Sequence, residues 1–277
     1  MKMSSSAIGS ALSAARRQAP ADDPVFQSNQ WESQYLRCLL DARFRGHDRQ
    51  GIQEMSDRLR LLITGFGPFP GAPFNPTQPL VARLLRLRRP ALSDVELFGH
   101  VFPVTYRNVD HELPELLASC RPHALLMFGL ATRTAHVRIE TRARNAVTLL
   151  WPDAGHVRPR RGSISGGIDG LMFGPHTAKL LRAAVGTGID ARASRNAGSY
   201  LCNYLSWRAI EASCRDDGPR LAAFVHIPLF PRGSSQQKNT THRIAFEQMV
   251  DAGEAMLVEM VKLTRQAVRN SAHTERY

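Results

Sequence analysis

Two kinds of hydrophobic pattern alternate along the chain from residue 59 onward. Short apolar runs bounded by glycine, proline or polar residues are typical of buried strands. They occur at residues 59–64, 95–104, 124–128, 191–194 and 222–227. Between them, apolar residues spaced three and four apart predict amphipathic helices. These helices are expected at residues 79–89, 110–119, 175–185 and 244–266, with a further one beginning near residue 200. The alternation predicts an α/β fold, a three-layer α/β/α sandwich with a mixed, mostly parallel central sheet.

Three segments interrupt this regular pattern. Residues 137–145 have the pattern of another extended stretch, and residues 158–170 are rich in glycine, serine and arginine, which predicts a loop. Residues 1–54 are dominated by serine, alanine, glutamine and aspartate, and their apolar periodicity is weak. Met55 then begins a segment that resembles an ordinary protein start. We expect residues 1–54 to be a disordered extension or an artefact of an upstream start site, and residues 55–277 to form a single α/β domain.

Composition narrows the functional classes. The formal net charge is +12, but only four lysines are present and the arginines are scattered. They are not interleaved with aromatic residues, and no zinc-finger spacing occurs, so we expect no nucleic-acid binding. No apolar run approaches the roughly 18 to 20 residues that a membrane span needs, so we expect no membrane association.

The cysteines point away from metal and disulfide chemistry. Cys38, Cys120, Cys202 and Cys214 form no CxxC pair, and their spacings match neither a zinc site nor a dense disulfide framework. We therefore expect no metal and a reducing, cytoplasmic environment.

Cys202 alone has a setting that suggests reactivity. It follows Asn196, Gly198 and Ser199, residues typical of a tight turn, and it lies close to a predicted helix start. Free backbone N–H groups and the helix dipole stabilise a thiolate there, which predicts a lowered thiol pKa. The alternative is that Cys202 is a small buried hydrophobic residue.

A histidine and a carboxylate have complementary settings. His226 lies in an apolar strand followed by Pro228, which places it near the carboxyl end of that strand, where open α/β sheets bind ligands. Glu140 is flanked by Arg138, Arg142 and Arg144. It either orients the imidazole of His226 or belongs to a surface ion-pair cluster, and His226 in turn is either functional or a core histidine. Together with Cys202 these residues match the parts of a cysteine hydrolase.

The loop after the first predicted strand carries aromatic rather than phosphate-binding features. The segment Gly65-Phe66-Gly67-Pro68-Phe69-Pro70-Gly71 lacks a GxGxxG spacing, and its prolines remove N–H donors that a phosphate cradle needs. A stiff loop that presents Phe66 and Phe69 suits a flat, small, apolar ligand. The alternative is that both rings belong to the core.

Taken together, these segments resemble the pyroglutamyl peptidase I (pyrrolidone-carboxylate peptidase) family. The resemblance covers about residues 59–263 and rests on several motifs in order. They are Gly65-Phe66-Gly67-Pro68-Phe69 with Asn75-Pro76, Gly129-Leu130-Ala131 leading to Glu140 and Asn145, Pro152-Asp153, Ala197-Gly198-Ser199-Tyr200-Leu201-Cys202-Asn203, and Phe224-Val225-His226-Ile227-Pro228.

This resemblance implies a cysteine omega peptidase that removes an N-terminal pyroglutamyl residue from small peptides without a metal or cofactor. It implies that Cys202 is the nucleophile, that His226 is the general base and acid, and that Glu140 orients His226. It further implies that Phe66 and Phe69 sandwich the pyrrolidone ring while Asn75, Trp151 and Leu201 complete the substrate site. The family also suggests a homo-oligomer.

The chain departs from the family pattern near the expected pocket, at Leu130, Thr141, Leu150 and Trp151. The family often has glutamine, arginine, arginine and isoleucine in these places, so the chain resembles a divergent member. Two alternatives to pyroglutamyl hydrolysis follow. One is a related cysteine amidohydrolase whose acyl pocket is reshaped by Leu130 and Trp151, and the other is a non-catalytic binding protein on the same fold.

Overall fold

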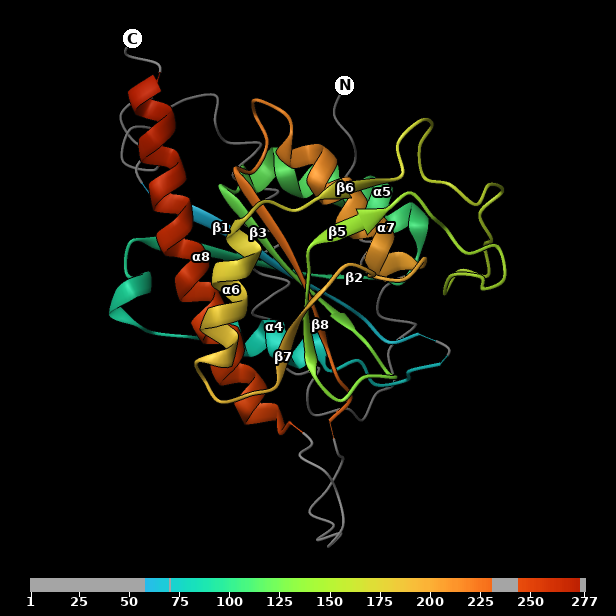
Figure 1. Ribbon diagram of the computed structural model, residues 1–277, viewed down its shortest axis with the longest axis horizontal. Helices are drawn as coiled ribbons and strands as arrows, with labels where there is room; N and C mark the ends of the chain where they lie inside the picture. Colours follow the sequence, from blue (N-terminus) through green and yellow to red (C-terminus); the bar gives the residue numbers. More distant parts are fainter. Residues whose placement is uncertain (1–57, 70, 231–243, 275–277) are drawn as a thin grey trace, which may run out of the picture.

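The computed structural model describes residues 58–69, 71–230 and 244–274 (Figure 1). The predicted extension at residues 1–54 lies outside these ranges. Within them, the chain builds a central sheet with helices packed against both of its faces (Figure 1).

The central sheet has six strands in the order β2-β1-β3-β8-β4-β7. Their bounds are β1 Leu59–Phe66, β2 Val95–Phe102, β3 Ala124–Leu130, β4 Val137–Glu140, β7 Ala191–Ser194 and β8 Leu221–Ile227. Strands β2, β1, β3 and β8 are parallel to one another, whereas β4 is antiparallel to β8 and parallel to β7. The prediction of a mixed, mostly parallel sheet is therefore confirmed.

Two apolar layers enclose this sheet. Helices α4 (Thr77–Leu85), α6 (His176–Val185) and α8 (Phe246–Thr274) contribute to one core, and α5 (Tyr106–Cys120) and α7 (Leu201–Ser213) to the other. Successive strand residues alternate between the cores, so that Leu61 and Ile63 belong to the first and Leu62 to the second. Because the middle of β1 is buried on both faces, Leu61, Leu62 and Ile63 form a continuous apolar run. The predicted three-layer sandwich is confirmed.

Local chemistry moves several helix ends from their predicted positions. Helix α4 ends at Leu85 rather than near residue 89, and a 3₁₀ turn follows at Pro90–Leu92. Because a residue before proline is disfavoured in the helical region, Arg89 is extended, with φ of −126° and ψ of 143°. Helix α5 begins at Tyr106, before the predicted start, because the Thr105 side chain caps it by accepting a hydrogen bond from the Asn108 N–H.

The single extended stretch predicted at residues 137–145 is wrong. It is two strands in two different sheets, since β4 ends at Glu140 and β5 (Arg142–Arg144) pairs with β6 (Gly170–Met172). Thr141 lies between them, and its N–H donates to the Ser194 carbonyl at 2.7 Å while its carbonyl accepts from the Phe173 N–H at 3.0 Å. These bonds direct the chain from one sheet to the other. The predicted loop at residues 158–170 lies in the long connection between β5 and β6.

Candidate active site

His226 and Glu140 meet across the β4–β8 pair. The Nδ1 atom of His226 lies 2.7 Å from Oε1 of Glu140. The side chains are 4% and 0% exposed respectively, so Glu140 does not belong to a surface cluster, and that alternative is wrong. Because an ionised carboxylate only accepts hydrogen bonds, Nδ1 carries the hydrogen, and Nε2 of the neutral ring carries the free lone pair.

The antiparallel register of β4 produces this contact. It places Arg138 opposite His226 and Glu140 opposite Phe224, so Glu140 is the diagonal neighbour of His226. Diagonal neighbours on one face of a sheet are within reach of long side chains. The contact of Arg138 and Glu140 with His226 thus depends on the antiparallel pairing of β4 with β8.

Cys202 reaches the same point of the sheet from α7. Gly129 of β3 is the register partner of His226. A Cβ atom built on Gly129 would lie 2.8 Å from Sγ of Cys202 and 2.6 Å from the ring of Phe224. Only glycine leaves room for the thiol there, so the sulfur packs on the backbone beside His226.

The start of α7 leaves its backbone donors free of side-chain capping. Its N-cap is Tyr200, which makes no side-chain capping bond. The first N–H groups of a helix have no partner within the helix, and those of residues 201–203 are the ones nearest the thiol. The preceding turn uses Gly198, whose φ of 86° suits glycine.

Burial opposes the lowering of the thiol pKa that the helix terminus predicts. Burial raises the pKa of Cys202 to about 12, the charge of Glu140 adds to this rise, and Arg138 and the helix backbone oppose it. Burial also lowers the pKa of His226 below 6.5, against the hydrogen bond and charge of Glu140. At neutral pH the thiol and the imidazole are therefore both uncharged.

Arg138 joins this cluster, although the sequence indicated only that it flanks Glu140. Its Nη2 atom lies 3.1 Å from Nδ1 of His226 and 3.3 Å from Oε1 of Glu140. The signal available in the sequence was spacing, since residues two apart in a strand share a face.

In the aromatic loop at residues 65–71, Phe66 lies in the core and Phe69 lies nearer the surface. Phe66 is 2% exposed and packs near Phe102, with ring centroids 6.0 Å apart, so the core interpretation holds for Phe66. Phe69 is only partly buried against the same core. The Asn75 side chain shapes the loop, since its Nδ2 donates to the Gly67 carbonyl and its Oδ1 accepts from the N–H and hydroxyl of Thr77.

The other two predicted substrate residues have opposite environments. Leu201 is 1% exposed and its side chain belongs to the core, so it faces no open pocket. Trp151 is 62% exposed. Its loop is fixed against the start of α7, because the Tyr200 hydroxyl donates to the Pro152 carbonyl at 2.9 Å.

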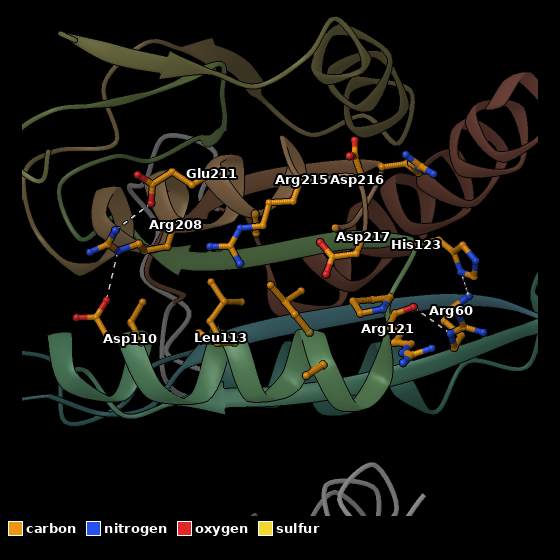
Figure 2. A pocket seen from close by; sticks show the side chains of 18 residues that line it. Arg60, Asp110, Leu113, Arg121, His123, Arg208, Glu211, Arg215, Asp216 and Asp217 are labelled. Atoms are coloured by element: carbon orange, nitrogen blue, oxygen red, sulfur yellow. Dashed lines mark hydrogen bonds and ion pairs between the residues drawn. The ribbon is translucent and has the colours of Figure 1, made fainter. Parts of the chain in front are cut away.

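Two cavities among the described residues do not include Cys202, His226 or Glu140. A cavity of about 790 Å³ lies between α5 and α7 and is lined by none of the three (Figure 2). Its Arg208 is paired with Glu211 and Asp110. By contrast Cys202, His226 and Glu140, here called the triad, converge on one point of the sheet, where His226 and Glu140 are buried. A cavity of about 660 Å³ is lined by residues 71–74, 132–135 and 228–230 and by Ile244, and so lies next to the end of β8, the strand of His226.

The comparison with known proteins agrees with this geometry. The family model described as pyroglutamyl peptidase matches residues 59–262. The chain belongs to the pyroglutamyl peptidase family. The match includes all three of Cys202, His226 and Glu140.

Individual members of the pyroglutamyl peptidase family are distant but similar over most of their length. The pyrrolidone-carboxylate peptidase of Pyrococcus furiosus is 29% identical over 62% of this chain and 82% of its own. The pyrrolidone-carboxylate peptidase of Oceanobacillus iheyensis is 30% identical over 61% of this chain and 83% of its own length. The crystal structure of the enzyme from Fervidobacterium islandicum AW-1 superposes with a TM-score of 0.66 at 26% identity, covering 74% of this chain and 99% of that one.

Two absences hold for the described residues. None of their helices is long and apolar enough to cross a membrane. No three of their His, Cys, Asp and Glu side chains are grouped as a metal site.

Proposed function

We propose that this protein is a cysteine exopeptidase that hydrolyses the amide bond after an N-terminal pyroglutamyl residue. The observation that carries the proposal is the buried Glu140–His226 pair with the Cys202 sulfur packed on Gly129, the register partner of His226. Nucleophile, base and orienting carboxylate are the three parts that acyl transfer by a cysteine needs.

Because the Cys202 thiol and the His226 imidazole are both uncharged, the first step includes a proton transfer between them. Nε2 of His226 accepts the thiol proton while the Cys202 sulfur bonds to the carbonyl carbon of the scissile amide. The negative charge then develops on the carbonyl oxygen, and the uncapped N–H groups at the start of α7 are suited to stabilise it. Glu140 stabilises the imidazolium through Nδ1–H.

Two steps, acyl transfer to Cys202 and hydrolysis of the thioester, complete the cycle. The carbon–nitrogen bond breaks, His226 gives its proton to the leaving amine, and a thioester to Cys202 remains. Water then attacks the thioester while His226 accepts a proton. The carbon–sulfur bond breaks, free pyroglutamate leaves, and the thiol is restored.

The acyl pocket is the less conventional part of the site. Phe69 is the half-buried ring available to an apolar pyrrolidone face, and the exposed Trp151 lies on the loop fixed to Tyr200. These residues, with Leu130, favour a second candidate function, a cysteine amidohydrolase with another small acyl group.

We further propose that the protein acts on small peptides in the cytoplasm and forms a homo-oligomer. Light scattering on the purified full chain measures the last of these directly.

Three fluorogenic amides of one amine test the function. We expect kcat/KM for the pyroglutamyl amide to exceed that for the prolyl and glutamyl amides by at least about 100-fold. A site that forms hydrogen bonds to the lactam rejects analogues that lack the lactam. The Cys202→Ala variant should lose turnover and remain folded, while Cys214→Ala should match the unchanged protein, since Cys214 is exposed at the end of α7.

The other outcomes choose among the alternatives. Turnover of the prolyl amide alone would favour the altered amidohydrolase. No turnover of any of the three amides, combined with tight binding of a pyroglutamyl peptide, would favour the binding protein.

A further inference from the structure

Arg138 occupies an unusual position for a charged side chain. It lies on β4 directly opposite His226, and its side chain is 23% exposed while that of Glu140 is fully buried. The side chain of Arg138 is therefore more exposed than the Glu140–His226 pair that it contacts.

The hydrogen on Nδ1 decides what Arg138 binds. Because Nδ1 donates to Glu140, it cannot also accept from Arg138, although Nη2 lies 3.1 Å away. Nη2 instead forms an ion pair with Oε1 of Glu140 at 3.3 Å. One carboxylate oxygen thus accepts the imidazole N–H and is also the ion-pair partner of the guanidinium.

No other described group neutralises this carboxylate. Oε2 of Glu140 and Nε of Arg138 are buried and have no hydrogen-bond partner. Of the neighbouring elements, β3 contributes uncharged Gly129 and α7 contributes the thiol. On β7 the register partner of Arg138 is Arg192, which is paired with Asp190.

We propose that Arg138 is a positioning residue that shares Oε1 of Glu140 with His226, and so fixes the carboxylate and sets the pH range in which Cys202 reacts. Its link to turnover rests on the proposed function, whereas its effect on Cys202 does not. Nothing in this geometry brings Arg138 to the substrate, since it lies on the Nδ1 side of the ring and the thiol chemistry uses Nε2.

The charge of Arg138 has a definite sign of effect. After burial, it is among the factors that lower the pKa of His226, and it opposes the rise in the pKa of Cys202. Without this charge both pKa values rise. His226 must be neutral to accept the thiol proton. The rise in the reaction rate of Cys202 with pH therefore moves to higher pH.

Three variants separate charge from hydrogen bonding. Arg138→Met loses both, Arg138→Gln keeps N–H donors without charge, and Arg138→Lys keeps the charge. Arg192→Met is the matched control, because it removes a positive charge from the neighbouring strand at the same register. If Arg138→Met does not fold, Arg138→Gln carries the test.

Two measurements are made on the full chain. For pyroglutamyl amide turnover by Arg138→Met we expect kcat to fall about tenfold with KM nearly unchanged, a part of the roughly 10²- to 10⁴-fold that general acid–base catalysis supplies. The second measurement is the iodoacetamide rate at Cys202 against pH, read by peptide mass spectrometry because Cys214 is also accessible. Its rise should move to higher pH in Arg138→Met and Arg138→Gln, and stay near the original in Arg138→Lys and Arg192→Met.

The two readouts separate the two proposals. A protein that turns over no pyroglutamyl amide, yet shows the shifted alkylation profile, would refute the function and support the role of Arg138. An Arg138→Met variant with unchanged kcat and an unchanged alkylation profile would overturn the role of Arg138, as would a KM effect without a kcat effect.

Discussion

The arginine–carboxylate cluster between α5 and α7 and the one at the β4–β8 pair differ chiefly in burial. In the cavity beside α5 and α7, the side chains of Arg208, Asp110 and Glu211 are 34% to 45% exposed (Figure 2). At the β4–β8 pair, Glu140 is 0% exposed and His226 4%. Exposed pairs contribute about 0–1 kcal/mol, whereas removal of one partner from a buried pair leaves an uncompensated charge. The same residue types are therefore expendable in the first cluster and strongly coupled in the second.

The buried cluster also leaves polar atoms unsatisfied. Oε2 of Glu140 and Nε of Arg138 have no hydrogen-bond partner among the described residues. Such atoms cost stability, but Nε of Arg208 in the first cluster is another, so burial of the carboxylate is what distinguishes the two clusters.

Exchange of glutamate for glutamine in each cluster tests the contrast most strongly. We expect Glu140→Gln to lower kcat by roughly 10³- to 10⁴-fold, because the amide no longer fixes the imidazole tautomer or stabilises the imidazolium. Glu211→Gln should change kcat by less than about twofold and stability by about 0–1 kcal/mol. Steady-state kinetics and urea unfolding measure both. Equal losses of activity in the two variants would remove the distinction between the clusters.

A glycine pair tests whether close packing holds the thiol. Gly129→Ala should destabilise the protein by about 1–3 kcal/mol and lower kcat, since its Cβ would overlap Phe224 and the Cys202 sulfur. At Gly166 a Cβ meets no atom within 4 Å, so Gly166→Ala should stay within about 0.5 kcal/mol. Thermal unfolding with parallel kinetics separates the two effects. Full activity in Gly129→Ala would mean that the sulfur is not held against β3.

The smallest effect concerns pH and stability. Burial lowers the pKa of His226 below 6.5 in the folded protein, so in the window beneath 6.5 the unfolded chain binds more protons than the folded one. Stability is then complete above pH 6.5 and falls as pH decreases through that window. His226→Gln should flatten this fall, as measured by urea unfolding at a series of pH values. A steeper fall in His226→Gln would reverse the sign assigned to His226.

The sequence predicted the elements of the sheet better than their connections. Apolar runs located β1, β3 and β8, because a strand buried on both faces leaves a continuous signal. The stretch at residues 137–145 has one continuous pattern, yet it divides at Thr141 because of bonds to Ser194 and Phe173. These partners are distant in sequence, and local periodicity carries no trace of them.

The site likewise has features that local sequence patterns predict and others that depend on contacts between distant residues. Local settings pointed to His226 at a strand end and to Cys202 at a helix start, and the family resemblance added their roles and that of Glu140. The helix terminus beside Cys202 is visible in the sequence, whereas the burial that raises the thiol pKa is not. Arg138 was noticed only as a neighbour of Glu140, since its approach to His226 depends on the antiparallel register of β4.

The place of β8 in the sheet has a consequence for synthesis of the chain. Among the described strands it is the last in sequence, yet it lies between β3 and β4. Before residues 221–227 are synthesised, β3 and β4 lack the strand that joins them, and His226 is absent. Pairings of such long sequence separation form slowly. In the proposed mechanism, activity therefore reports that β8 has paired between β3 and β4.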